Sequence, residues 1–268
     1  MSVDPELRSL DIEIPAQPDV LVKLSVLMAE EEIDLLAVSA LVEGDMALAA
    51  AVLKAVNSSL YGLRGRVQTV HQALTYLGMR EVSAIAFEMS LRAAFPPTAE
   101  LDPVWERAAK RGLMMGRIGQ IIGVDPWASH SAGLFEECGK AVLYRHAPQH
   151  YPAMLRAAAS DAELCALEAS AFGVGHDALG AALCESWGLA PAAVASVRHH
   201  VTVQASGEMP EALQRRGVAG VSAIVYTLMT DPDALEMRVA SLARQAQFDE
   251  AGALRAARRV QEQMEERS

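Results

Sequence analysis

The residues best suited to chemistry are three histidines and a glutamate doublet in the second half of the chain. His199 and His200 are adjacent, His176 lies upstream, and Glu136 is followed by Glu137. Imidazoles and carboxylates bind metals, and paired carboxylates can act as general acid and base. Neighbouring positions on a helix, however, point about 100° apart. We therefore favour one packed and one exposed histidine over a ligand pair. For the glutamates we favour a structural ion pair or a solvated edge over an acid–base pair.

Two further groups of residues admit more than one interpretation. His176 can cap or bridge helices, and we favour this structural role over metal binding. A basic cluster could grip a phosphate or an acidic partner, although a solvated surface is the simpler interpretation. That cluster consists of Lys54, Arg64, Arg66 and Arg80.

Composition limits the class of protein. The 268 residues are 51% hydrophobic but only 5% aromatic, a mixture that suits helix packing better than strands. A net charge of −11 disfavours direct binding of nucleic acid. Three scattered cysteines, Cys138, Cys165 and Cys184, are typical of buried thiols in a reducing compartment. With neither a signal peptide nor a long apolar run, we expect a cytoplasmic protein that does not enter a membrane.

Helix signals recur along the chain, and we find no convincing strand, so the sequence predicts an all-α fold. The predicted helix starts are at Pro18-Asp19, Asp34, Asp45, Thr69, Asp102-Pro103 and Asp125-Pro126. Pro96-Pro97 is the clearest break, because proline cannot continue a helix. We therefore predict a helical subdomain over 1–97, a second over 98–232 and amphipathic terminal helices over 233–268. In the terminal helix, Leu254, Ala257, Gln261 and Met264 share a face that packs on its own chain or forms a homodimer contact.

Two segments of this order and spacing resemble the HDOD domain family of bacterial signalling modules. The first runs from Asp45 through Asn57-Ser58-Ser59-Leu60-Tyr61-Gly62 to Leu77-Gly78, and the second is Ala132-Gly133-Leu134-Phe135-Glu136-Glu137-Cys138-Gly139-Lys140. The later His176, Trp187-Gly188-Leu189 and His199-His200 also match the family pattern, so the resemblance covers roughly 14–205. The motif positions that we carry over are Asp45, Asn57, Ser58, Gly62, Gly78, Gly139 and Lys140. The resemblance implies two helical subdomains, the second related to HD-type metal phosphohydrolases.

The same resemblance implies a metal site whose ligands are largely replaced here. The His-Asp doublet of HD enzymes corresponds to Glu136-Glu137, and the ligand histidine expected shortly after a tryptophan corresponds to Arg107. The usual late aspartate falls near Met229, where no carboxylate stands. Because Arg107 carries a permanent positive charge, we hypothesise that it pairs with Glu136 or Glu137 in place of a metal. The positions of this vestigial site are Arg107, Glu136, Glu137, His176, His199 and His200.

We therefore expect a regulatory module without catalytic residues, bound metal or cofactor. It would act in bacterial signal transduction by recognising a protein partner, with a small ligand in the vestigial pocket as a further modulator. The alternative is a divergent metal-dependent phosphohydrolase that acts on a nucleotide or a cyclic dinucleotide. We find no phosphate-binding loop, Gly-x-Ser-x-Gly or His-Glu-x-x-His motif to support other chemistry.

Overall fold

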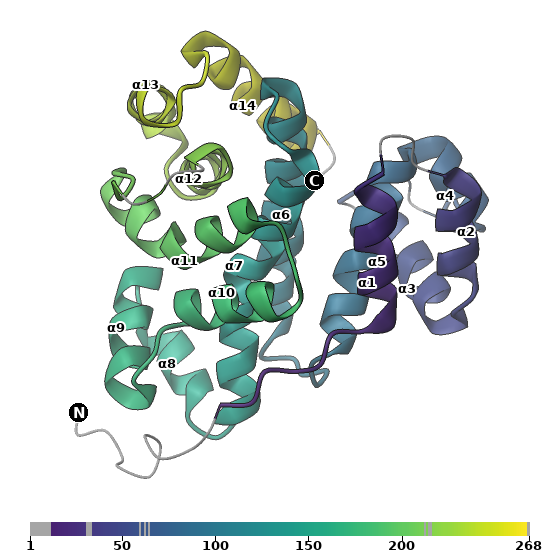
Figure 1. Cartoon of the computed structure of the whole chain (residues 1–268), viewed down its shortest axis with the longest axis horizontal. Coiled ribbons are helices and arrows are strands. Elements are labelled where there is room, and N and C mark those ends of the chain that lie inside the picture. The colour runs from purple at the N-terminus through teal and green to yellow at the C-terminus, as the bar shows by residue number, and fades with distance from the viewer. Residues whose placement is uncertain are drawn as a thin grey trace. The chain divides into compact units, whose positions relative to one another are not determined.

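The computed structural model describes residues 12–30, 34–58, 60–61, 63, 65–211, 213 and 216–266. These residues form helices and contain no strand, which confirms the predicted all-α class (Figure 1). Internal contacts divide the chain into two compact units. Unit 1 comprises Met1–Pro15 with Thr98–Val260, and unit 2 comprises Ala16–Pro97 with Gln261–Ser268. The three-part division predicted from the sequence stays a prediction.

Five helices lie wholly within the described residues of unit 2, and three of them begin at a side-chain cap. They are α1 (Asp19–Met28), α2 (Leu35–Glu43), α3 (Met46–Val56), α4 (Val70–Leu77) and α5 (Met79–Ala93). The carboxylates of Asp34 and Asp45 and the hydroxyl of Thr69 accept hydrogen bonds from the first-turn backbone N–H groups of α2, α3 and α4. Helix α5 packs against the other four helices, and its residues Val82–Phe87 are all buried.

In unit 2, the Asn57 side chain connects the end of α3 to the loop at Val67 through hydrogen bonds. Its side-chain Nδ2 donates to the backbone oxygens of Leu53 and Val67, and its Oδ1 accepts from the Val67 N–H. The role therefore exceeds the helix termination expected from the sequence. Ser58 lies in the turn that follows, Gly78 links α4 to α5 with a φ of 83°, and Gly62 is outside the described residues.

Unit 1 is built around α7 (Pro126–His146). The other elements are α6 (Asp102–Ile122), α8 (Tyr151–Ala157), α9 (Asp161–Phe172), α10 (His176–Ser186), α11 (Pro191–Ser206), α12 (Arg216–Thr230), the short 3-10 helix η2 (Pro232–Ala234), α13 (Leu235–Ala246) and, as far as Val260, α14 (Glu250–Glu265). Every residue of α7 from Ala128 to Tyr144 is buried, and the helix packs against α6, α8, α10, α11 and α12. Asp102 is the first helical residue of α6 and Leu101 is its N-cap, so the predicted cap at Asp102 is wrong.

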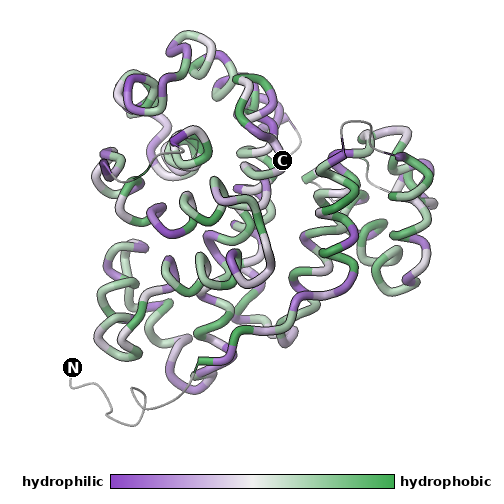
Figure 2. The backbone as a smooth tube through the Cα atoms, viewed as in Figure 1, coloured by the Kyte–Doolittle hydropathy of each residue, from purple (hydrophilic) through white to green (hydrophobic). Residues whose placement is uncertain are grey.

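Two apolar features bear on the sequence predictions. The buried residues of the terminal helix α14 include Ala253, Ala256, Ala257 and Val260. Apolar residues recur along the helices of both units (Figure 2).

No single described helix is long and apolar enough to cross a membrane. Helices α2 and α3 reach the required length and apolar content only when they are taken together, and the pair is bent by 110°.

Candidate functional site

Close packing of α6 on α7 brings charged residues of the two helices together. A Cβ atom added at Gly133 would lie 2.7 Å from the Gly112 Cα, so the two backbones approach as only glycines allow. Arg107 and Arg111 are one turn apart on α6 and face α7 beside this contact. Glu136, Glu137 and Lys140 share the facing turn of α7.

These residues form a buried ion-pair cluster. Arg111 Nη1 lies 2.9 Å from Glu136 Oε2 and 3.5 Å from Glu137 Oε1. Lys140 Nζ lies 2.9 Å from Glu137 Oε2, and Arg107 Nη2 lies 3.2 Å from the same oxygen. The pair hypothesised for Arg107 is thus present with Glu137, although the Arg107 side chain is 44% exposed, and the buried Arg111 pairs with Glu136. We predicted that adjacent glutamates diverge, but both reach Arg111, because its guanidinium lies between them.

A carboxylate on α9 completes the cluster. Lys140 Nζ lies 2.8 Å from Asp161 Oδ1, so three cations face three carboxylates and their charges balance. The cations are Arg107, Arg111 and Lys140, and the carboxylates are Glu136, Glu137 and Asp161. Because the unpaired burial of any one charge is costly, the members depend on one another.

Neighbouring charges shift the pKa values of three cluster members, Lys140, Arg111 and Glu137. Burial alone lowers the pKa of Lys140, but Glu137 and Asp161 outweigh it and raise that pKa above its usual value. In the same way Glu137 and Glu136 overcome burial and raise the pKa of Arg111. Burial raises the pKa of Glu137, but Lys140, Arg111 and Arg107 together hold it far below its usual range. Glu137 therefore stays negative and Lys140 and Arg111 stay positive at neutral pH.

His176 is held by a second buried network beside the cluster. Glu168 Oε2 accepts from the His176 backbone N–H at 2.7 Å and lies 2.7 Å from its Nδ1, and the Tyr151 hydroxyl donates to Glu168 Oε1 at 2.5 Å. The predicted structural role of His176 as a bridge between helices fits these contacts. Gly139 permits the arrangement, because a Cβ there would lie 1.9 Å from the His176 carbonyl oxygen.

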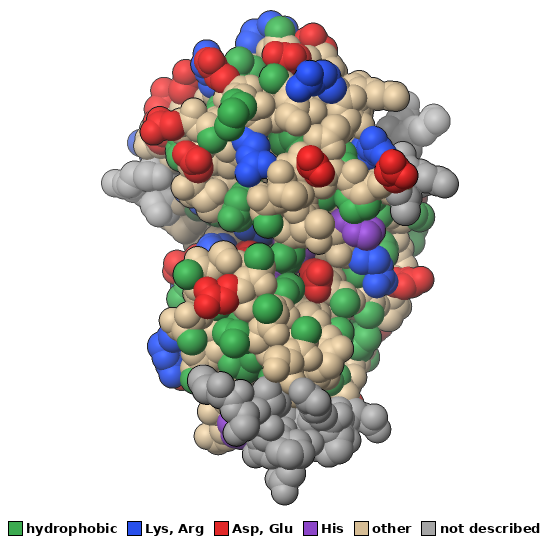
Figure 3. All heavy atoms as spheres, turned by 90° about the vertical axis from the view of Figure 1, so that its left-hand side faces the viewer, with side chains coloured by type: hydrophobic (Ala, Val, Ile, Leu, Met, Phe, Trp, Pro, Cys, Tyr) green, Lys and Arg blue, Asp and Glu red, His purple; other side chains and the backbone are tan. Residues whose placement is uncertain are grey.

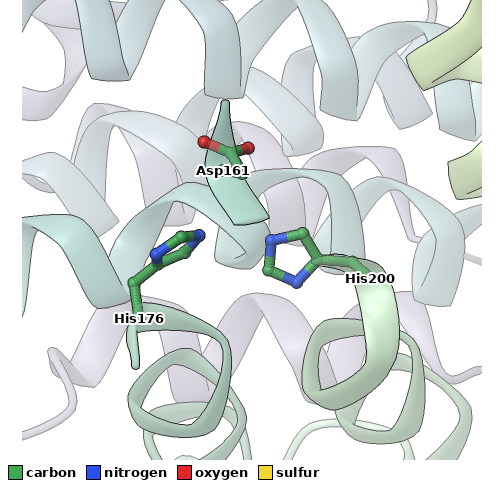
Figure 4. Close-up of side chains that lie close together, drawn as sticks. All are labelled: Asp161, His176 and His200. Carbon is green, nitrogen blue, oxygen red and sulfur yellow. The ribbon is translucent and has the colours of Figure 1, made fainter. Parts of the chain in front are cut away.

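His200 faces His176 with its ring centroid 5.5 Å away, and Asp161 lies beside both rings (Figure 4). His200 Nδ1 lies 2.6 Å from the Val197 carbonyl oxygen. Since a carbonyl only accepts, Nδ1 carries the proton and Nε2 keeps its lone pair. Burial lowers the pKa of His200 to about 4, so the ring is neutral. His199 is only partly exposed on α11, which agrees roughly with one packed and one more exposed histidine.

The family resemblance implies metal ligands, so we tested whether these residues fit a divalent ion. Asp161, His176 and His200 each offer a ligand atom within 4.8 Å of one another. However, Asp161 already pairs with the buried Lys140, and the doublet carboxylates pair with Arg111 and Lys140. An ion would have to displace these cations or lie beside them, with repulsion that is strong in a buried site. The described donor set therefore does not fit a two-metal site of the HD type.

Sequence reasoning missed several residues of this site. Arg111 and Glu168 were not singled out, nor were Asp161 and Tyr151. Gln204 was also missed: its Nε2 donates to Glu136 Oε2 and to the Ser222 hydroxyl, both at 3.0 Å. The four-residue spacing from Arg107 to Arg111 and the seven-residue spacing from Asp161 to Glu168 were available signals, since each defines one helix face.

The cysteine prediction needs one correction. Cys138 and Cys184 are buried, but Cys165 is partly exposed, with its Sγ 3.4 Å from His176 Nδ1. Burial, with the negative charges of Asp177 and Glu168, raises the pKa of Cys165 to about 12, so it is a poor nucleophile. Of the predicted basic cluster, Lys54, Arg66 and Arg80 are exposed in unit 2, and Arg64 lies outside the described residues.

Comparison with known proteins agrees with this geometry. An uncharacterized protein of Treponema pallidum (strain Nichols) is 25% identical over 196 residues, which cover 70% of this chain but only 37% of that relative. An HDOD domain protein of unknown function from Geobacter sulfurreducens superposes with a TM-score of 0.70 at 17% identity, covering 96% of this chain and 94% of that one. A candidate signal transduction protein from Marinobacter aquaeolei VT8 superposes with a TM-score of 0.71 at 23% identity, covering 96% of this chain and 57% of that one.

A candidate phosphohydrolase from Shewanella amazonensis SB2B also superposes, with a TM-score of 0.67 at 19% identity, covering 98% of this chain and 96% of that one. At these identities the solved structures show a shared fold. The family model described as the HDOD domain matches residues 14–203, close to the range of the resemblance. The chain therefore belongs to the HDOD domain family.

Proposed function

We propose that this HDOD chain is a non-catalytic regulatory module that acts in signal transduction by recognising a protein partner. The observation that carries the proposal is the neutralisation of Glu136 and Glu137 by Arg111 and Lys140. Metal-assisted hydrolysis of a phosphoester needs an ion that generates hydroxide and stabilises negative charge. Here fixed protein cations occupy the carboxylates that would hold that ion.

The charge distribution supports a protein partner rather than nucleic acid. The chain has a net charge of −11. On the face shown in Figure 3, acidic and basic side chains are interspersed. A nucleic-acid site usually presents a continuous basic surface, because phosphate contacts supply most of its affinity.

Turnover assays test the non-catalytic part of the proposal. The purified full chain is incubated with manganese and a panel of phosphomonoesters, phosphodiesters and cyclic dinucleotides. We expect no hydrolysis above the rate in buffer. Hydrolysis that His200→Ala abolishes, while a matched His150→Ala variant keeps it, would contradict the proposal.

A divergent metal-dependent phosphohydrolase is the second candidate, and one observation favours it. Asp161, His176 and His200 converge, and His200 Nε2 is buried without a hydrogen-bond partner among the described residues. A single ion at these three atoms, with Lys140 displaced from Asp161, would supply a Lewis acid. The same assay separates the two candidates.

A further inference from the structure

Unit 2 has an open apolar groove between its first two helices, which we call the α1–α2 groove. Its lining residues are Val22, Lys23, Val26 and Leu27 from α1 and Ala37 and Leu41 from α2. Among the described residues that line it, Lys23 alone is charged. At about 350 Å³ the groove is at the small end for a ligand pocket, and it is open to solvent. It therefore suits a few side chains of a partner better than a whole small molecule.

The apolar residues of these helices are unusually exposed. Of the lining residues, Val22 is 44% exposed and Val26 is 60% exposed, one turn apart on α1. Leu36, next to the lining residue Ala37 on α2, is 75% exposed but does not line the groove. Isolated apolar residues on a surface need no explanation, but neighbouring ones on an open groove indicate a contact surface. The one-turn spacing of Val22 and Val26 forms a ridge of the kind that packs against another helix.

The charge around the groove defines what can bind there. Residues 19–45 contain one cation, Lys23, and seven carboxylates: Asp19, Glu30, Glu31, Glu32, Asp34, Glu43 and Asp45. One positive and seven negative charges give −6 for this segment. Residues 46–97 contain five cations and two carboxylates, which give +3. Of the seven carboxylates, the five in described residues belong to exposed side chains. The helices of the groove are thus the acidic part of unit 2.

We propose that the α1–α2 groove docks an amphipathic helix of a partner protein, with an apolar stripe at i, i+3, i+4 and i+7 and flanking lysines or arginines. Apolar side chains would fill the groove, and the basic flanks would meet the exposed carboxylates. An anionic membrane surface would be repelled by these carboxylates. A second copy of the chain would bring the same negative charge against itself. This inference rests on the proposed recognition function and adds to it the site and the chemistry of the partner.

The test uses the full chain and a labelled designed helix of about 16 residues, with leucines at the stripe positions and lysines on its flanks. A second peptide carries glutamates in place of the lysines. Val22→Ser/Val26→Ser removes apolar surface from the groove, and serine has a helix propensity close to that of valine. Met237→Ser, at a 72% exposed site on α13 of unit 1, is the matched control. Far-UV circular dichroism checks the folding of each variant.

We expect the lysine peptide to bind at least about tenfold more tightly than the glutamate peptide, and more weakly as salt rises. The double serine variant should lose about tenfold in affinity, and Met237→Ser should keep it. Glu30→Gln/Glu43→Gln should weaken binding of the lysine peptide but not of the glutamate peptide. This second variant leaves the apolar lining intact.

Equal binding of the two peptides, no binding, or full binding by the double serine variant would overturn the inference. So would binding to anionic phospholipid vesicles, or a dimer in sedimentation analysis that Val22→Ser/Val26→Ser dissociates. If the peptide results contradict docking at the groove while the chain hydrolyses no phosphoester, only the docking inference is wrong and the proposed function stands. Turnover would contradict the proposed function whatever the peptides do.

Discussion

The guanidinium of Arg111 lies 2.9 Å from a carboxylate oxygen of Glu136, and both side chains are buried. This pair joins α6 to α7 at the position where an HD-type enzyme would have part of its metal doublet. A buried pair is not necessarily a net source of stability, since desolvation offsets attraction. Breaking the pair from one side is costly, because the remaining charge stays buried.

Arg111→Met tests this dependence. The substitution leaves Glu136 without its cation and weakens the neutralisation of Glu137, so we expect the free energy of unfolding to fall by about 3–5 kcal/mol. Urea denaturation followed by circular dichroism measures the loss. Lys110→Met, at the neighbouring exposed position on α6, should change stability by less than about 0.5 kcal/mol. Equal effects of the two substitutions would argue against a mutually dependent cluster.

Tyr151→Phe removes the hydroxyl that donates to Glu168 at 2.5 Å. A hydrogen bond to a buried carboxylate contributes about 1.5–3 kcal/mol, and we expect a loss of that size. The thermal unfolding midpoint reports it. Tyr76→Phe removes a hydroxyl from a 63% exposed side chain and serves as the control. An unchanged midpoint for Tyr151→Phe would mean that Glu168 holds His176 without this partner.

Gly139→Ala should be more damaging than its size suggests. The new methyl group would lie 1.9 Å from the His176 backbone oxygen, and backbone on both sides leaves little room to adjust. We expect a loss of more than about 3 kcal/mol, or failure to fold. In Gly217→Ala on α12 the nearest atom would be a Val124 methyl at 3.4 Å, an ordinary contact. Denaturation of the two variants side by side decides whether this close approach constrains residue 139.

The stability of unit 2 should depend on pH through Glu88. Burial raises the pKa of this carboxyl from 4.5 to about 7, although the charge of Arg92 lowers it. The folded state therefore binds a proton more tightly than the unfolded state. This contribution is fully present below pH 4.5 and is lost as pH rises through 7.

Glu88→Gln removes that pH-dependent loss of stability, because glutamine is neutral at every pH. At pH 8 the variant should be more stable than the natural chain by up to about 3 kcal/mol, a figure that already includes the effect of Arg92 on the pKa. The advantage should shrink at pH 4.5. Urea denaturation at the two pH values measures the difference, and exposed Glu43→Gln is the control. A pH-independent effect of Glu88→Gln would contradict the shifted pKa.

The sequence predicted well the features that depend on neighbouring residues, and poorly the contacts between residues that are distant in the sequence. Asp34, Asp45 and Thr69 cap the helices expected of them, because a cap depends on residues within one turn. The family motif also located Glu136, Glu137 and His176. Asp161 and Glu168 were missed because only packing of α9 beside α7 and α10 gives them a role. Cys165 was predicted to be buried because burial is the norm for cysteine, and only the placement of its helix sets the exposure.

Metal content tests the central claim most directly. The full chain is incubated with manganese, iron or zinc, passed through gel filtration and analysed by mass spectrometry of the elements. We predict far less than one ion per chain, because Arg111 and Lys140 already neutralise the carboxylates that would hold it. One ion per chain, lost in His200→Ala and kept in His150→Ala, would contradict this account.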